Sequence, residues 1–330
     1  MKKPKVTISV LAKDLGLSTA TISRAMNHST LITPDVIEKV QVRAKELGYV
    51  SRPVKKQRDR AILNVKLVLP HRDQPEMQLF YDLSELIQGI RKGAGSVKVQ
   101  LVSLLESETH QIFDHKKGGH IDAVLFAFCE ANEQMYKELD SKNIPFLSLN
   151  RSSHGGDYVV PNTDIGFIEL LETMKASLKG NEKFNPLFLN LKSATSEVQK
   201  QREKSFLNAL DMIGLEKTPL KERVWKLKNL KAIDDELVEK IEASSYNAIC
   251  CFNDVVAASL IQYLPTNDKL AVGGYDYSPF VHMLKHKLTT VSMEVNEFGL
   301  QAGEWLVKKV IDKDQKSFRE KVKGRIVVVE

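Results

Sequence analysis

The fold of the first fifty residues is decided by the stretch Leu11-Ala12-Lys13-Asp14-Leu15-Gly16-Leu17-Ser18-Thr19-Ala20-Thr21-Ile22-Ser23-Arg24-Ala25-Met26-Asn27. Apolar residues at helical spacing predict a short first helix: Ile8, Leu11, Ala12 and Leu15. Gly16 ends this helix, because glycine adopts a left-handed conformation at little cost. Ser18 is placed to cap a second helix that carries several hydroxyls and Arg24. The pattern predicts a helix-turn-helix, whose second helix enters the major groove of DNA.

A third helix follows with clear start and stop signals. Thr33 is the expected N-cap, Pro34 takes the first helical position, and Gly48 stops the helix. The three helices are expected to share a core, for which apolar spacing selects Ile8, Leu15, Ile22, Met26, Val40 and Leu47. A three-helix bundle without a DNA role is the alternative at this point.

Charge favours the DNA interpretation. Residues 1–60 carry thirteen Lys and Arg against five Asp and Glu, a net charge of +8, whereas the whole chain has +6. The positive excess therefore lies entirely in this segment. A concentrated basic end is typical of proteins that bind the phosphate backbone, with an affinity that falls as salt rises. A membrane-surface helix would need Trp or Phe anchors, which these residues lack.

Composition sets the broad class. At 330 residues and 42% hydrophobic, the chain is long enough for a small domain and a larger two-lobed one. No apolar run approaches the roughly 18–20 residues that span a bilayer, and no apolar segment typical of a secretory signal follows Met1. Cys129, Cys250 and Cys251 lie in apolar runs without metal-site spacing, as buried thiols do in a reducing compartment. We expect a cytoplasmic protein without metal, other cofactor or membrane partner.

From residue 61 onward, strands and helices alternate, which predicts parallel sheets with helices on both faces. The expected strands are 65–69, 99–104, 123–128, 144–149, 187–190, 223–226, 248–252 and 270–274. The expected helices are 81–93, 132–141, 166–178, 197–213, 234–243 and 255–264. The series restarts after Asn162, so we expect two lobes with a ligand crevice where the carboxyl ends of their strands face each other.

Residues 6–50 resemble the DNA-binding headpiece of the LacI/GalR family of bacterial transcription regulators. The resemblance rests on residues at family positions: Ala12, Gly16, Ser18, Thr21, Ser23, Arg24, Asn27, Gly48 and Tyr49. The rest of the chain resembles that family's effector domain, which has the fold of periplasmic sugar-binding proteins. Its landmarks occur in family order: Ile121-Asp122-Ala123, Ile144-Pro145, Leu149-Asn150-Arg151, Gln201-Arg202-Glu203, Asn253-Asp254-Val255-Val256-Ala257, Gly274-Tyr275-Asp276, Leu288-Thr289-Thr290-Val291, Gly299 and Ala302.

The resemblance implies a domain plan. An all-α headpiece is expected at 1–50, a linker at 51–60, and an α/β effector-binding and dimerisation domain at 61–330. The first lobe is expected to comprise about 61–161 and 292–318, and the second about 162–291 and 319–330.

The resemblance also implies which headpiece residues contact DNA. Thr19, Ala20 and Arg24 occupy positions that read base edges, where arginine suits guanine and the other two suit thymine methyl groups. Five further residues are expected to position the phosphate backbone: Thr7, Ser18, Thr21, Ser23 and Asn27. The alternatives are local cap or turn contacts for the hydroxyls and a solvated position for Arg24.

The linker departs from the family pattern. Family members carry a hinge helix with a leucine that wedges into the minor groove. Here Lys55 replaces a small residue, and Arg58 falls where the leucine is expected. A hinge helix starting at Pro53 stays open, but a leucine wedge is excluded. Lys55, Lys56 and Arg58 either bind the backbone and a narrowed minor groove or form a plain basic linker.

For the effector, the resemblance implies ligand roles for Arg151 in the first lobe and Arg202, Asn253 and Asp276 in the second. Charged bidentate groups suit a sugar-like ligand, with an aromatic face beside the ring. Phe80 and Tyr81 are the expected stacking residues. The alternatives are salt bridges between the lobes for the arginines and helix caps for Asn253 and Asp276.

Two substitutions bear on the identity of the effector. Asn150 replaces an acid that often precedes the family arginine, and Met293 stands at a ligand position where glutamine is common. With one acid lost and two arginines kept, we expect the pocket to tolerate an anionic sugar, such as a sugar acid or a sugar phosphate.

Catalytic motifs are missing from the sequence. His282 and His286 have HxxxH spacing, but Met283 stands where HExxH needs its glutamate, and there is neither a glycine-rich phosphate loop nor a GxSxG elbow. The sequence therefore predicts a homodimeric, effector-controlled repressor that binds double-stranded operator DNA, and not an enzyme. Induction and corepression are both open. The alternatives are a sugar-binding protein without a DNA role and a phosphosugar or nucleotide enzyme on a Rossmann-like fold.

Overall fold

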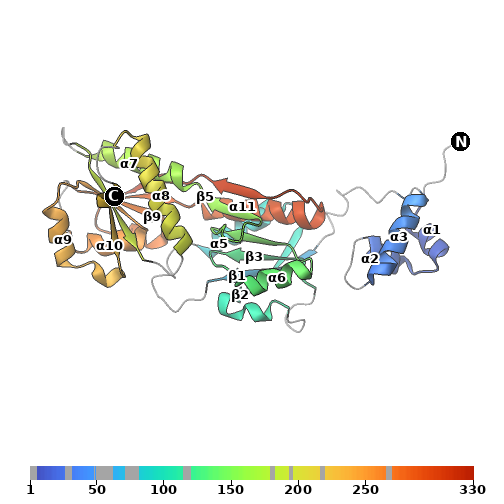
Figure 1. The fold of residues 1–330 in the computed structure, drawn as a ribbon. Coiled ribbons are helices and arrows are strands. Elements are labelled where there is room, and N and C mark those ends of the chain that lie inside the picture. Colours follow the sequence, from blue (N-terminus) through green and yellow to red (C-terminus); the bar gives the residue numbers. More distant parts are fainter. Residues whose placement is uncertain are drawn as a thin grey trace. The chain divides into compact units, whose positions relative to one another are not determined.

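The computed structural model describes residues 6–26, 32–47, 49, 62–70, 82–113, 120–178, 183–192, 196–215, 220–264 and 270–330. The chain divides into two compact units, Met1–Asp59 and Arg60–Glu330, and each is considered by itself (Figure 1).

The first unit contains three helices, α1 (Ile8–Leu15), α2 (Thr19–Met26) and α3 (Pro34–Glu46). Gly16 ends α1 with a left-handed φ of 65°, and the Ser18 hydroxyl accepts a hydrogen bond from the Thr21 amide at 3.0 Å. Both predicted signals are therefore confirmed. Thr33 takes the predicted N-cap position of α3, although its side chain makes no capping hydrogen bond. Gly48 lies outside the described residues.

The three helices share one apolar core. Ile22 and Val40 are fully buried, as predicted, and Ile8, Leu15, Met26 and Leu47 pack around them half-buried. Smaller residues complete the centre together with Leu11: Ala12, Ala25 and Ala44. On the surface, the Arg43 guanidinium binds both carboxylate oxygens of Asp14 at 2.6 and 3.0 Å, and this hydrogen bonding lowers the pKa of Asp14. This pair fastens α3 to α1.

The second unit holds two six-stranded sheets among its described residues. The first sheet is entirely parallel, in the order β11-β5-β4-β3-β1-β2. Its strands are β1 (Ile62–Leu69), β2 (Lys98–Leu105), β3 (Ala123–Ala127), β4 (Phe146–Leu149), β5 (Tyr158–Pro161) and β11 (Arg319–Val322). The segments accompanying it are α5 (Leu83–Ala94), the 3₁₀ segment η2 (Glu106–Gln111), α6 (Glu133–Ser141), α11 (Val295–Leu306) and the π-helical η7 (Val307–Ile311).

The second sheet has the order β12-β10-β9-β8-β6-β7, with β12 antiparallel to β10. Its strands are β6 (Pro186–Leu191), β7 (Val224–Leu227), β8 (Ala248–Cys251), β9 (Ala271–Asp276), β10 (Leu288–Ser292) and β12 (Arg325–Val329). The helices are α7 (Thr163–Ser177), α8 (Ser196–Met212), α9 (Asp235–Glu242) and α10 (Asp254–Ile261), with short 3₁₀ segments η4 (Leu220–Arg223), η5 (Leu230–Ala232) and η6 (Pro279–Met283).

One boundary of the predicted lobes is wrong. We expected residues 319–330 in the second lobe, but β11 pairs in parallel with β5 of the first sheet, from Arg319 opposite Tyr158 to Val322 opposite Pro161. Backbone bonds at both ends, from Tyr158 N to Phe318 O and from Asn162 N to Val322 O, fasten this edge strand. The chain therefore crosses between the sheets at Lys323–Gly324, and only the residues from β12 onward join the second sheet.

Helices α5 and α11 lie side by side along the first sheet, in unusually close contact (Figure 1). Glycines line this contact on both helices: Gly89 and Gly93 on α5, and Gly299 and Gly303 on α11. A Cβ at Gly93 would lie 2.8 Å from the Leu300 carbonyl carbon and would overlap its oxygen. The two backbones therefore touch directly. No helix in the described part of the chain combines the length and the apolar composition needed to cross a bilayer.

Candidate functional site

Helix α2 has a buried face and an exposed polar face. Ile22 and Ala25 are fully buried in the headpiece core. Thr19, Ala20 and Arg24 are exposed, and Ala20 and Arg24 are four residues apart, so they occupy one face of the helix. Ser18, whose hydroxyl caps the helix, and Thr7 are exposed as well, while Thr21 and Ser23 are half-buried. The residues predicted to read bases thus lie together on the free face.

In the second unit, Arg202 on α8 and Asp276 at the end of β9 form a buried ion pair. Their exposed fractions are 2% and 7%, and Asp276 Oδ1 accepts from Arg202 Nη2. Arg202 Nη1 donates to the Phe252 carbonyl at 2.6 Å, and the guanidinium lies 4.3 Å from the Tyr275 ring centroid. Arg202 Nε is buried without a hydrogen-bond partner. This guanidinium is therefore held on three sides, and its Nε–H is free to donate to a ligand.

Arg151 follows β4 in the first sheet and is 5% exposed. Its Nη1 donates to the Asn150 carbonyl at 2.6 Å and its Nη2 to the Phe128 carbonyl at 2.9 Å, while Nε is buried without a partner. Burial lowers the pKa of this guanidinium, the charges of Glu130 and Glu197 raise it, and the charge of Arg202 lowers it. Arg151, beside the first sheet, thus interacts electrostatically with Glu197 and Arg202 on α8, beside the second sheet.

A direct contact joins the same two regions. Glu197, in the first turn of α8, accepts hydrogen bonds from the Ser152 hydroxyl at 2.6 Å and from the Ser152 amide at 3.1 Å. Ser152 is the neighbour of Arg151, and Glu197 lies on the same helix as Arg202. The hydrogen bonds therefore fasten the loop after β4 to the start of α8, beside both arginines.

The other predicted effector residues fall into three groups. Asn253 is 2% exposed, and its side chain caps α10 by accepting from the Val256 amide at 3.0 Å, which was the alternative interpretation. Met293 is 3% exposed and packs within the apolar core, and its predicted ligand contact stays a prediction. The remaining predicted site residues lie outside the described residues: Asn27, Lys55, Lys56, Arg58, Phe80 and Tyr81.

Sequence reasoning missed three polar groups of this region: Ser152, Glu197 and Asp254. Asp254 is fully buried between α10 and the neighbouring strands. Its only sequence signal is its place in the quoted run Asn253-Asp254-Val255-Val256-Ala257, beside a residue that was selected. Ser152 and Glu197 are 45 positions apart, and no local pattern relates them.

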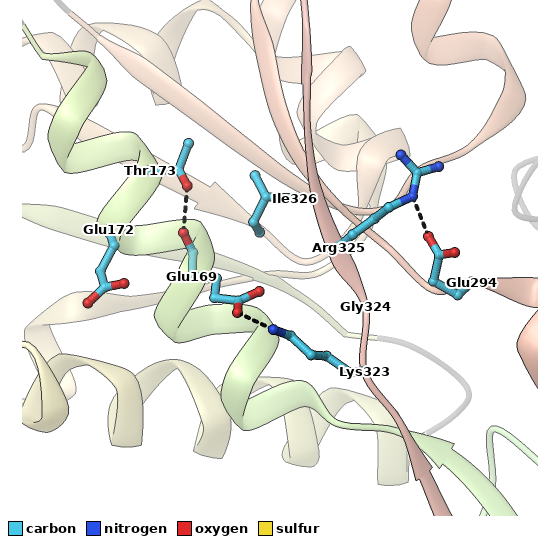
Figure 2. Close-up of a pocket in the computed structure, with 8 residues that line it drawn as sticks. All are labelled: Glu169, Glu172, Thr173, Glu294, Lys323, Gly324, Arg325 and Ile326. Atoms are coloured by element: carbon cyan, nitrogen blue, oxygen red, sulfur yellow. Dashed lines mark hydrogen bonds and ion pairs between the residues drawn. The ribbon is translucent and has the colours of Figure 1, made fainter.

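A hollow of about 540 Å³ lies elsewhere, where the chain crosses from β11 to β12 (Figure 2). Two ion pairs line it, Lys323 with Glu169 and Arg325 with Glu294, each at 2.7 Å. None of its lining side chains contains a buried polar atom without a partner. Buried donors without a partner occur instead at Arg151 and Arg202, so we place the effector candidate at these two arginines.

The chain is similar to transcription regulators along nearly its whole length. It is 25% identical to the HTH-type transcriptional regulator DegA of Bacillus subtilis, over 90% of this chain and 89% of that protein. It is 24% identical to the HTH-type transcriptional repressor PurR of Vibrio atlanticus, over 93% of both chains. No family model matches.

Solved structures show the same fold. The complex of the transcriptional regulator CelR with cellobiose superposes with a TM-score of 0.61 at 18% identity, over 98% of both chains. The lac repressor dimer bound to operator and an anti-inducer gives 0.58 at 15% identity, over 99% of this chain and 98% of that one. A LacI-family regulator from Enterococcus faecium with bound ribose gives 0.59 at 16%, over 80% of this chain and 96% of that one. These likenesses agree with the resemblance drawn from the sequence: along nearly its whole length the chain is similar to bacterial transcription regulators, and it has the fold of LacI-family regulators.

Proposed function

We propose that this chain is a cytoplasmic repressor that binds operator DNA as a homodimer. A small carbohydrate-like effector lowers or raises its affinity for the operator. One observation carries the DNA part: α2 turns Thr19, Ala20 and Arg24 outward while Ile22 and Ala25 anchor its other face. A helix fixed in this way presents a guanine-reading side chain and two methyl-contacting ones as one surface.

Support for the dimer comes from the lac repressor, which is a dimer on its operator. A dimer presents two recognition helices to two half-sites about one helical turn apart, so the operator is expected to be pseudopalindromic.

Support for the effector comes from the buried polar groups near α8. Arg202 and Asp276 offer a donor and an acceptor in fixed geometry, and Arg151 and Arg202 each keep a buried Nε without a partner. Sugar hydroxyls both donate and accept, so they match this set. A neutral sugar is therefore the first candidate, as in the cellobiose and ribose complexes of similar regulators.

An anionic sugar is the second candidate. Among the described residues Arg151 forms no ion pair, so a ligand carboxylate or phosphate would meet a buried cation that has only backbone carbonyls as partners. Glu130 and Glu197 oppose this, because both charges act on Arg151. Calorimetry that detects binding of neutral sugars only would exclude the anionic class.

The effector is expected to control operator affinity by changing how the two lobes are arranged. An effector that binds one arrangement of the lobes better than another shifts the equilibrium by its difference in affinity, typically about 1–3 kcal/mol. The Ser152–Glu197 hydrogen bonds fasten one such arrangement beside the effector candidate.

The proposed function is tested by a gel shift on the region upstream of the chain's own gene. The titration uses cellobiose, D-ribose, gluconate and ribose 5-phosphate, with a scrambled duplex as control. We expect a sequence-specific shift whose midpoint moves with at least one sugar. A shift that is equal on scrambled DNA would contradict operator recognition, and a specific shift that no sugar moves would contradict only the choice of effector class.

Arg24→Ala is expected to blur operator recognition. Loss of a bidentate guanine contact costs about 1–3 kcal/mol of discrimination, so the ratio of operator to random-duplex affinity should fall about fivefold to 150-fold. Fluorescence anisotropy on both duplexes measures this ratio. Lys13→Ala is the matched control, because Lys13 is an exposed cation on α1. It should weaken binding to both duplexes equally; an unchanged ratio in Arg24→Ala would remove Arg24 from the reading face.

A further inference from the structure

Asp254 is a carboxylate in the interior of the second unit, where such groups need strong partners. It is the first residue of α10 and has no exposed surface. It accepts a hydrogen bond from the Ser278 amide at 2.6 Å and another from the Thr290 hydroxyl at 2.6 Å. One side chain therefore ties α10 to β10 and to the loop that follows β9.

That loop carries Asp276 in an unusual conformation. Asp276 has φ = 102° and Tyr277 has φ = 53°, a region that residues other than glycine rarely adopt. Such a backbone persists only when its surroundings hold it, and the bond from Ser278 N to Asp254 lies directly after these two residues. Gly274 leaves space for the Asp254 carboxylate, because a Cβ at this position would overlap Asp254 Oδ1.

We propose that Asp254 is a positioning residue of the effector site, whose ionised carboxylate holds the loop from Asp276 to Ser278 in the conformation that presents Asp276 to Arg202 and to the effector. This inference rests on the proposed effector role of Asp276 and adds a residue that is too deeply buried to contact a ligand in the described conformation.

Few charged or titratable groups surround the carboxylate. Asp276 on β9 repels it, and Arg202 on α8 neutralises Asp276. The Cys251 thiol on β8 lies near enough for Asp254 to help raise its pKa, after burial and the neighbouring Cys250. β10 contributes the uncharged Thr290, and the loop contributes Ser278. Burial and then Asp276 raise the pKa of Asp254 to about 7, against its two hydrogen bonds. The ionised and protonated forms of Asp254 are thus about equally populated near neutral pH.

A pH dependence of effector affinity follows. Apparent affinity scales with the fraction of molecules in the competent state, here the ionised one. With a pKa of about 7 this fraction is about nine-tenths at pH 8 and about one-tenth at pH 6, so full coupling weakens binding about tenfold between these pH values.

Stability responds in the opposite sense. A carboxylate whose pKa is higher in the folded state than in the unfolded state stabilises the fold fully at pH values below the unfolded-state pKa of 3.8. This stabilisation is lost as the pH rises through the folded-state pKa of about 7. Asp254→Asn removes this dependence. We therefore expect the variant to have a Tm at pH 8 no lower than that of the wild type while its effector affinity is lower, a combination that general damage to the fold would not produce.

The experiment compares the wild type, Asp254→Asn and Asp235→Asn. Asp235 is the matched control because it is the first residue of α9 in the same unit, but it is exposed. Titration calorimetry with D-ribose and with cellobiose at pH 6 and pH 8 gives the affinities, and thermal unfolding at pH 8 gives the Tm. Amide hydrogen exchange of residues 276–284 without sugar reports on the loop.

We expect the wild type and Asp235→Asn to bind sugar about tenfold more weakly at pH 6 than at pH 8. Asp254→Asn should bind at both pH values at least as weakly as the wild type does at pH 6, and its loop should exchange at least about threefold faster, because a charge-assisted bond becomes a neutral one. If Asp254→Asn keeps the wild-type affinity, pH profile and exchange rate, the proposal is overturned. If the wild type binds neither sugar, the proposed effector class fails, and the exchange rate together with the Tm still decides the positioning role.

Discussion

Replacing Arg202 with alanine is expected to abolish the response to effector and to destabilise the second unit strongly. Removing one partner of a buried ion pair leaves the other charge uncompensated, which costs about 3–5 kcal/mol. Asp276 is 7% exposed, and in the described structure Arg202 is its ion-pair partner. The free energy of unfolding from urea titration, and calorimetry with sugar, measure the two effects.

Two further variants separate stability from function. Lys204→Ala is the control, since Lys204 is an exposed cation on the same helix and should leave both quantities within about 0.5 kcal/mol of the wild type. The double variant Arg202→Ala with Asp276→Ala should recover part of the lost stability, because no unpaired charge stays buried, without recovering effector binding. A single Arg202→Ala variant with wild-type stability would show that the pair is not buried as described.

Gly93→Ala is expected to destabilise the first lobe, against the usual effect of this substitution in a helix. Helix propensity alone favours alanine by about 1 kcal/mol. The added Cβ would overlap the Leu300 carbonyl oxygen on α11, and this atom is backbone, so no rotamer change can relieve the clash. Forcing the helices apart should cost about 3 kcal/mol or more, beyond what propensity returns.

Thermal and urea unfolding of the intact chain measure this loss. Gly156→Ala is the control, because a Cβ at Gly156 would meet its nearest atoms at 3.6 and 3.8 Å, which is ordinary contact. It should change stability by less than about 0.5 kcal/mol. An unchanged or raised Tm for Gly93→Ala would mean that α5 and α11 do not touch along their glycines.

Most of the fold was predictable from local signals. The three headpiece helices are marked by Gly16, Ser18 and Pro34, and the structure places helix boundaries next to each of them. In the second unit, alternating apolar strands and helical stretches predicted the parallel sheets that are observed. Helix α11 was not among the predicted helices, and β11 was assigned to the wrong lobe. Seven of the twelve residues of Val295–Leu306 are buried, so this helix lacks a clean polar face.

The effector candidate was predictable only in part. Family positions selected Arg202 and Asp276, which the structure joins, and Arg151, which lies within electrostatic range of Arg202. They did not select Ser152 with Glu197, or Asp254 with Thr290, which make the contacts around those residues. Met293, predicted as a ligand residue from its place in the sequence, packs within the apolar core, and its ligand role stays a prediction.

By itself the sequence determined the class of protein, the helix-turn-helix and its outward residues, and the alternation of strands and helices. Capping, turn formation and amphipathic spacing act over a few neighbouring residues, so they can be read along the chain. The tertiary structure alone decided which sheet takes β11, which glycines allow α5 and α11 to touch, and which hydroxyls and amides surround the buried carboxylates. These contacts join residues as far apart as Glu85 on α5 and Asn296 on α11, 211 positions along the chain, and depend on burial and packing that no local pattern specifies.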